Sequence, residues 1–177
     1  GSPISLSESI VGDSTLTVDR NKGIIYGVKV CGLHSPNTYG FKGCSGTEYT
    51  LEALEKAKHL YEGIQVNADH PPRSRPDQER CIDDLIGWLS NVTVKDDGIY
   101  ADLNLLLEDR RTAKIFEAAE RNPKMFGLSH NAMGRGEMRG DKWTILEIPE
   151  VKSVDVVSDA ATVNSLYESK RQPVKIR

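Results

Sequence analysis

The sequence predicts an α+β domain built on an antiparallel sheet or barrel. Three observations lead to this class. β-Branched and aromatic residues gather in several short runs, turn sequences such as Asp96-Asp97-Gly98 join neighbouring runs, and two internal segments have helical spacing. The strands and helices do not alternate in a βαβ rhythm, so a parallel sheet is not expected.

The first part of the chain begins with a predicted hairpin. Strand-like runs at 15–19 and 24–33 flank a turn that ends in Gly23, where glycine suits the left-handed backbone conformation. Residues 34–46 are rich in Gly, Ser, Pro and Asn, which predicts a surface loop. A helix is expected over 50–62, because apolar residues recur on one face and a threonine stands at the N-cap.

The second part alternates strands with one further helix. A strand at 64–68 leads into a proline-rich loop at 69–80, and loops of this kind often carry functional residues. Strands at 85–94 and 99–107 form the clearest hairpin, since apolar and polar residues alternate in the second strand. Further elements are expected at 109–121 (helix), 126–133 and 143–157 (strands, the second broken near Pro149) and 164–169 (a short helix).

Composition limits the classes of function. The chain has 177 residues and a formal net charge of −3, which does not favour a broad phosphate-binding surface, so we expect no nucleic-acid partner. No apolar run approaches the length of a membrane span and no signal-peptide pattern is present, so we expect a soluble protein with no membrane partner. Three irregularly spaced cysteines favour a reducing compartment.

The chain is expected to hold one domain. We assign residues 4–168 to this domain and residues 169–177 to a basic C-terminal tail or linker. Gly1-Ser2-Pro3 resembles a remnant of an expression vector and is left out of the fold prediction.

Ser129 is the candidate nucleophile. It lies in Gly127–Gly134, a segment of small residues bracketed by glycine. A serine hydroxyl is weakly nucleophilic at its ordinary pKa, so this hypothesis requires a base within hydrogen-bonding distance and a third group that orients the base. The rest of the chain must supply both groups.

His70 is the best candidate base among four histidines. It stands where an apolar strand meets the proline-rich loop, so its ring can reach a neighbouring strand without entering the core. His59 is expected on a solvated helix face and His34 in a glycine-rich loop. His130 should point to the opposite side of its strand from Ser129, because successive strand residues alternate.

The residues offer three candidates for the acidic group that would orient the base. Asp155 is a charged residue in the otherwise apolar run Ser153–Val157, and a carboxylate there needs a partner. Asp159 and Asp69 are the alternatives.

Four segments together resemble a known family: Asp69-His70-Pro71, Ile86-Gly87, Gly127 to Ala132, and Ser153 to Thr162. They are similar to tailed-phage prohead maturation proteases, which are related in fold to herpesvirus assemblin, and the likeness extends from about residue 27 to residue 162. The resemblance implies an assemblin-like, mostly antiparallel β-barrel with surrounding helices. One departure is Ala160, where many relatives have proline.

The resemblance also implies an activity. Ser129 matches the nucleophile and His70 the base of a serine endopeptidase, and Asp155 best matches the third member. The implied substrates are the internal scaffold protein and the removable segment of the major capsid protein. The implied location is inside the procapsid in the infected bacterial cytoplasm. We expect the protein to be a homo-oligomer and to need no cofactor or metal.

Self-cleavage is a further implication. Some relatives cut after glutamate with an apolar residue two positions earlier, and Leu6-Ser7-Glu8 and Leu166-Tyr167-Glu168 fit this pattern. Cleavage after Glu8 and Glu168 is therefore expected as a hypothesis, although Ala53-Leu54-Glu55 fits the pattern inside a predicted helix.

Several charged and small residues are candidates for substrate contacts. Arg73 and Arg75, with Arg80 in the same loop, and Arg135 just past Ser129 offer cations to an acidic substrate residue. Met133 to Gly136 can bend sharply and is a candidate to shape the oxyanion hole.

Two other classes of function remain open. A capsid or scaffold module with the same fold and no catalysis would leave Ser129 unreactive. A cysteine or metal hydrolase is the second alternative, but Cys31, His34 and Cys44 lack the paired spacing of a zinc site and Cys81 is distant in sequence.

Overall fold

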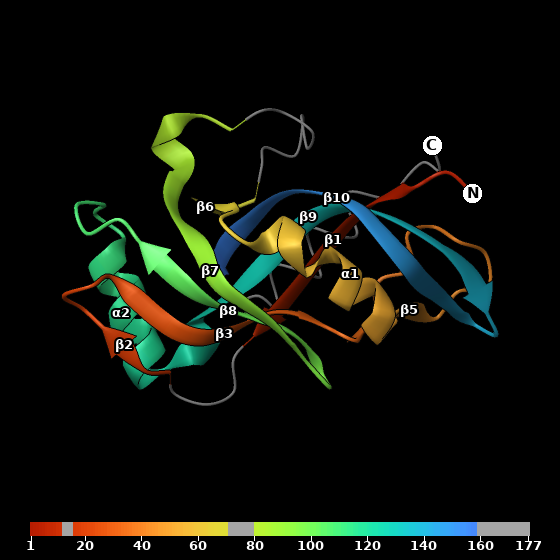
Figure 1. Ribbon diagram of the computed structural model, residues 1–177, viewed down its shortest axis with the longest axis horizontal. Helices are drawn as coiled ribbons and strands as arrows, with labels where there is room; N and C mark the ends of the chain where they lie inside the picture. Colours follow the sequence, from red (N-terminus) through yellow and green to blue (C-terminus); the bar gives the residue numbers. More distant parts are fainter. Residues whose placement is uncertain (12–15, 71–79, 159–177) are drawn as a thin grey trace.

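The computed structural model describes residues 1–11, 16–70 and 80–158, which form a ten-stranded sheet with two α-helices (Figure 1). The main strand order is β1-β9-β10-β6-β7-β8-β3-β2, and β5, paired with β4, lies beside β10. The strands are β1 (Ile4–Val11), β2 (Val18–Asp19), β3 (Ile24–Gly32), β4 (His34–Ser35), β5 (Gly46–Tyr49), β6 (Gln65–Ala68), β7 (Leu85–Lys95), β8 (Gly98–Leu105), β9 (Phe126–Arg139) and β10 (Lys142–Ser158). The helices are α1 (Leu51–Tyr61) and α2 (Thr112–Arg121), with short 3₁₀ turns η1 (Ile82–Asp84) and η2 (Pro123–Met125).

The fold confirms the α+β class and the mostly antiparallel pairing. Two pairs are parallel, β10 with β5 and β10 with β6. No strand pairing joins the two ends of the sheet within the described part of the chain, so the sheet is not closed and the predicted barrel is not confirmed. The predicted helix at 164–169 and the basic tail lie outside the described residues.

Local sequence signals account for several elements. Gly23 joins β2 to β3 with φ of 76°, as the hairpin prediction required. Thr50 caps α1, because its hydroxyl accepts a hydrogen bond from the Ala53 amide at 3.1 Å. The β7–β8 hairpin forms around Asp96-Asp97-Gly98 as expected.

Helix α2 begins at Thr112, three residues later than predicted. The carboxylate of Asp109 accepts a hydrogen bond from the Arg111 amide at 2.8 Å, and the Asp109 carbonyl accepts one from the Thr112 amide. The Thr112 hydroxyl donates to the carbonyl of Leu106 at 2.6 Å. Residues 109–111 therefore form a turn before the helix, because an aspartate side chain competes well for nearby backbone amides.

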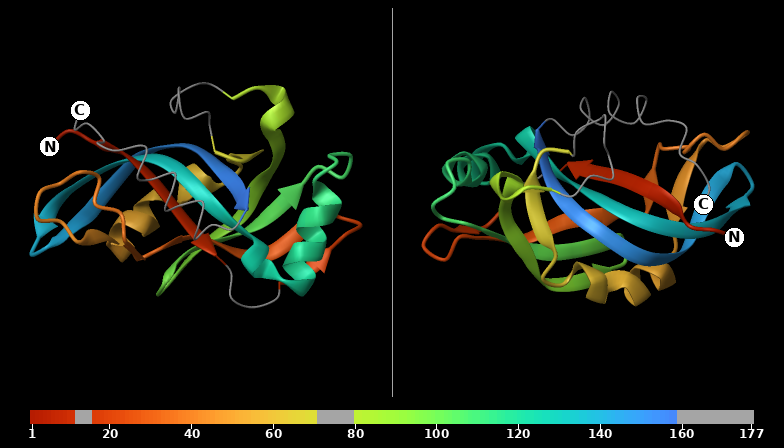
Figure 2. Two further views of the ribbon diagram at one scale, coloured as in Figure 1. Left: turned by 180° about the vertical axis from the view of Figure 1, so that it is seen from behind. Right: turned by 90° about the horizontal axis from the view of Figure 1, so that it is seen from above.

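Strand β9 extends six residues beyond its predicted end at residue 133, and with β10 it forms the largest hairpin of the sheet (Figure 2). The sequence predicted that the second strand breaks near Pro149, whereas β10 runs through it without interruption. The pairing register shifts between Glu147 and Glu150, so Pro149 lies at a bulge, where a residue without an amide hydrogen is tolerated.

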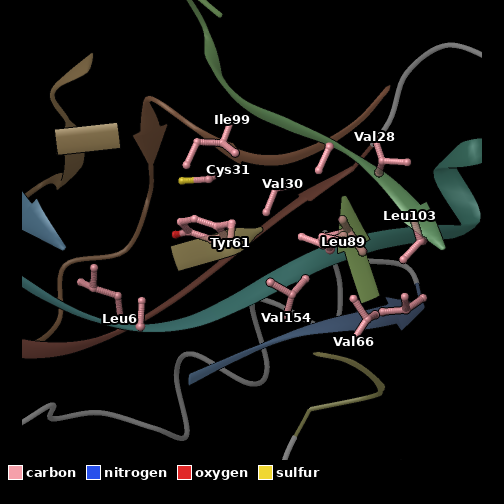
Figure 3. Close-up of a cluster of buried hydrophobic side chains, with 14 of the residues drawn as sticks. Leu6, Val28, Val30, Cys31, Tyr61, Val66, Leu89, Ile99, Leu103 and Val154 are labelled. Carbon is pink, nitrogen blue, oxygen red and sulfur yellow. The ribbon is translucent and has the colours of Figure 1, made fainter. Parts of the chain in front are cut away.

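The core lies between the strongly curved sheet and α1, which packs against β10 and β7 (Figures 1 and 3). Leu6 of β1, Tyr61 of α1 and Leu103 of β8 are fully buried. A side chain at Gly134 would place its Cβ 2.5 Å from the Leu6 side chain, so glycine there lets β1 lie close to β9. In the described ranges, no helix combines the length and apolar character needed to cross a bilayer.

Candidate active site

The register of β9 and β10 brings Ser129 and Asp155 together. The two residues are direct partners across the antiparallel pair, so their side chains leave the same face of the sheet. Both residues have an exposed fraction of 0%. On its other side, Ser129 lies opposite Ser9 of β1. The structure thus places the candidate nucleophile and the candidate acid on adjacent central strands.

A polar network surrounds the carboxylate of Asp155. The Asn131 amide donates to Asp155 Oδ2 at 2.8 Å and to the Ser153 hydroxyl at 3.0 Å. The Ser153 hydroxyl in turn donates to Asp155 Oδ1 at 3.4 Å. Asn67 of β6, the parallel neighbour of Asp155, also bonds to the carboxylate. Three adjacent strands therefore contribute polar side chains to one buried patch.

Burial controls the ionisation of Asp155. Loss of hydration raises the pKa of this carboxyl to about 7. The charge of Arg80 and the hydrogen bonds within the patch act in the opposite direction. The guanidinium Nη1 of Arg80 lies 3.2 Å from Asp155 Oδ1. Asp155 consequently changes charge near neutral pH, where a catalytic carboxyl is useful.

The hydroxyl of Ser129 is buried and has no hydrogen-bond partner among the described residues. An unsatisfied buried hydroxyl destabilises a protein by about 1–3 kcal/mol. Such groups need a specific explanation, and a catalytic role is one of the accepted ones. Ser129 stands out for this reason from Ser153 on the same face, whose hydroxyl is bonded.

His70 lies two residues beyond β6, the strand next to Asp155 on the far side from Ser129. The chain turns at Asp69, which has φ of 63°, and the Asp69 amide donates to the Val156 carbonyl at 2.8 Å. His70 is half-buried, with both ring nitrogens buried. The strand predicted at 64–68 is confirmed as β6, which ends two residues before His70.

The alternatives for the acid are placed differently. Asp69 is exposed, and its backbone rather than its carboxylate bonds to β10. Asp159 lies outside the described residues. Of these three carboxyls, the structure describes Asp155 as the one that is buried beside Ser129.

Comparison with known proteins adds the fold. The sequence matches no protein-family model, and no curated protein matches it. Among solved structures, the chain is similar to the bacteriophage T4 capsid assembly protease, gp21, with a TM-score of 0.55 and 15% identity. The alignment covers 88% of this chain and 98% of that chain. The two chains share a similar fold.

A second buried cluster lies on the opposite face of β9 from the candidate site. His130 faces the opposite side of β9 from Ser129, as predicted, and is fully buried. Its Nδ1 lies 2.6 Å from the Tyr61 hydroxyl and its Nε2 lies 3.2 Å from the Tyr49 hydroxyl. Burial lowers the pKa of His130 to about 4, so this histidine is neutral in the folded protein.

His34 and His59 lie at the surface, as expected. His34 is exposed and lies 3.6 Å from the carboxylate of Glu48. His59 is exposed on α1. His70 follows β6, the strand that pairs with the Asp155 segment of β10.

The structure describes two of the four arginines that were candidates for substrate contacts, Arg80 and Arg135. Arg73 and Arg75 lie outside the described residues, and exposed Arg135 pairs with Glu147 at 3.1 Å. Arg80, which the sequence placed among the candidate substrate contacts, instead points into the protein and contacts Asp155. Nη2 of Arg80 also donates to the carbonyl of Ala68 at the end of β6, a tertiary contact that sequence spacing does not reveal.

Met133 to Gly136 does not form the bend predicted for an oxyanion hole. The segment continues β9 as extended strand. A Cβ at Gly136 would lie 1.9 Å from the Thr144 carbonyl oxygen, so this glycine permits close packing of β10 against β9. The glycines here serve strand packing rather than a turn.

The candidate ligands of a metal site lie in different surroundings. Cys31 is buried near His130, whereas Cys44 bonds to the Gly46 carbonyl and His34 lies near Glu48. Within the described ranges, no three His, Cys, Asp or Glu side chains gather as metal ligands.

Proposed function

We propose that this chain is a serine endopeptidase that cleaves internal scaffold and capsid protein segments during phage procapsid maturation. The observation that carries this proposal is the unsatisfied Ser129 hydroxyl directly across from buried Asp155, within a capsid assembly protease fold. The chain would act inside the procapsid in the infected host, as a homo-oligomer with an assemblin-like barrel architecture.

The proposed mechanism needs only side chains and backbone amides. His70 takes the hydroxyl proton of Ser129 as the oxygen attacks the scissile carbonyl, and then gives the proton to the leaving amine. Asp155 favours the imidazolium form of His70 by its negative charge. Water then hydrolyses the acyl-enzyme. Each backbone amide that binds the oxyanion contributes about 3 kcal/mol.

Acylation by a small serine-directed fluorophosphonate tests the proposal. We expect covalent labelling of Ser129, mapped by peptide mass spectrometry, and a loss of labelling in His70→Ala because the base is removed. His59→Ala is the matched control, since His59 is exposed on α1 and away from the site. Absence of label on Ser129 in folded wild-type protein would favour the alternative, a catalytically inactive capsid or scaffold module.

Self-cleavage after Glu8 is part of the proposal. In the structure Glu8 lies opposite His130 and Ser9 lies opposite Ser129. The peptide bond between Glu8 and Ser9 therefore lies on β1, next to the strand that carries Ser129. Ile4 and Leu6 are buried, and cleavage would therefore release a segment that fills the core. Cleavage after Glu168 concerns a residue outside the described ranges.

Intact-mass spectrometry of aged protein checks the self-cleavage prediction. We expect loss of residues 1–8, and in addition loss of the segment after Glu168, in wild type but not in Ser129→Ala. Glu8→Gln should block the first cut alone. Full-length termini after prolonged incubation of protein that the fluorophosphonate labels would contradict this prediction.

A further inference from the structure

Arg80 links two parts of the candidate site. Its Nη1 donates to Asp155 Oδ1 at 3.2 Å, and its Nη2 donates to the carbonyls of Ala68 and Asp69 at 2.9 and 3.0 Å. Its Nε donates to Asp84 Oδ2 at 3.1 Å. The side chain is only 12% exposed. A planar guanidinium can satisfy several acceptors at fixed angles, which a lysine cannot do.

The two carbonyls belong to the peptide units immediately before His70. At Asp69 the chain leaves β6 with a positive φ of 63°, a conformation that costs free energy for a residue other than glycine. Contacts from the Arg80 guanidinium to both carbonyls hold this turn. The same guanidinium holds Asp155, so one rigid group sets the base-bearing chain relative to the acid.

Arg80 also supplies the positive charge at the carboxylate. Among the described groups that act on Asp155, Arg80 is the cation, while Asn67, Asn131 and Ser153 are neutral donors. The other charged or titratable groups around this end of β6 and η1 include Asp69, His70, Cys81, Asp83, Asp84 and Arg111. A buried carboxylate without its cation shifts toward the protonated form.

We propose that Arg80 is a positioning residue for catalysis, which fixes the turn that carries His70 against Asp155 and places a positive charge beside the Asp155 carboxylate. This inference rests on the proposed serine peptidase function. It assigns Arg80 to the interior of the site rather than to substrate recognition. Asp84 is its second anchor, because the Nε contact fixes the plane of the guanidinium.

The test measures the rate of Ser129 acylation from pH 5 to 9. Arg80→Met removes the positive charge and the hydrogen-bond donors of the guanidinium while keeping an unbranched apolar side chain. We expect the rate at pH 7 to fall about 10²-fold through misplacement of the base. We also expect the lower pH midpoint of the rate to rise by about one to three units, because Asp155 loses its cation.

Arg80→Lys separates position from charge. A single ammonium keeps the midpoint near its wild-type value, but it cannot engage Asp155 and both carbonyls together, so the plateau rate should still fall. Arg121→Met is the matched control, since Arg121 pairs with Glu117 on the exposed face of α2. Wild-type plateau and midpoint in Arg80→Met would overturn the proposal. If that variant does not fold, a wild-type plateau in Arg80→Lys would overturn it instead.

A readout without catalysis keeps this proposal distinct from the proposed function. The carboxyl carbon of Asp155 is titrated by NMR in wild type and in Arg80→Lys. We expect the resonance to titrate near pH 7 in both proteins, and to move to higher pH in Arg80→Met. If wild-type Ser129 is never acylated, the peptidase proposal fails; if the Asp155 titration is the same in Arg80→Met, the contribution of Arg80 fails.

Discussion

Replacing Ser129 by alanine is expected to abolish acylation and cleavage while making the protein more stable. Loss of the nucleophile should lower the rate by roughly 10⁴-fold or more. Removal of a buried hydroxyl that has no described partner should raise the free energy of unfolding by about 1 kcal/mol. Peptide cleavage assays and urea unfolding of the same preparation measure both effects.

Ser153→Ala is the matched control for stability. Ser153 lies on the same face, but its hydroxyl accepts from Asn131 and donates to Asp155. Its removal leaves buried polar groups with fewer partners, so this variant should be less stable than wild type. Equal destabilisation by Ser129→Ala and Ser153→Ala would show that the Ser129 hydroxyl makes a bond of its own.

The second large effect is expected for Asp155→Asn. The amide cannot stabilise the imidazolium of His70, and the rate should fall by roughly 10⁴-fold. The substitution also removes a buried carboxyl whose pKa in the folded protein is about 7, compared with 3.8 in a model peptide. Because the folded state holds this proton more tightly, the contribution of Asp155 to stability decreases as pH rises from about 4 to 7.

His130 changes the pH dependence of stability in the opposite direction from Asp155. Its pKa is about 4 in the folded protein and 6.5 in a model peptide, so its contribution to stability is lost as pH falls from about 6.5 to 4. In wild type, the decrease in stability with rising pH due to Asp155 opposes the increase due to His130. In Asp155→Asn the His130 slope stands alone, and stability should rise with pH over this range.

Thermal unfolding at pH 4.5, 5.5, 6.5 and 7.5 measures this difference between wild type and Asp155→Asn. Above pH 7 we expect Asp155→Asn to exceed wild type by on the order of 1–3 kcal/mol, because the ionised carboxylate is no longer buried. Asp141→Asn, a change of an exposed carboxyl, controls for net charge. Parallel pH profiles of wild type and Asp155→Asn would contradict the raised pKa of Asp155.

Short-range signals predicted the elements that they control directly. The turn at Gly23, the threonine cap of α1 and the Asp96-Asp97-Gly98 hairpin each depend on a few consecutive residues, and all three appear as expected. The alternation of strand residues also placed His130 correctly on the opposite face from Ser129. The sequence did not predict how far β9 extends or that β10 continues past Pro149. A bulge allows a strand to continue through a proline.

The network around Asp155 depends on contacts between residues distant in the chain. Parity alone puts Asn131 on the face of Ser129 and Ser153 on the face of Asp155, and this signal was available in the sequence. It becomes a network only through the pairing of β9 with β10. The contacts of Arg80 with Asp155 and with the Ala68 carbonyl join residues that are 75 and 12 positions apart, and no local pattern predicts them.

The bulges of β10 divide the hairpin into regions with different tolerance to changes in chain length. All three register shifts fall between Ile145 and Ser153, whereas the pairing from Ser153 to Ser158 is regular. An insertion or deletion in the bulged region can be absorbed there without altering which residues face each other at the site. A single-residue deletion within 154–158 would instead rotate the remaining side chains to the other face of the sheet. Natural length variation should therefore collect between Ile145 and Ser153 and stop before the regular segment.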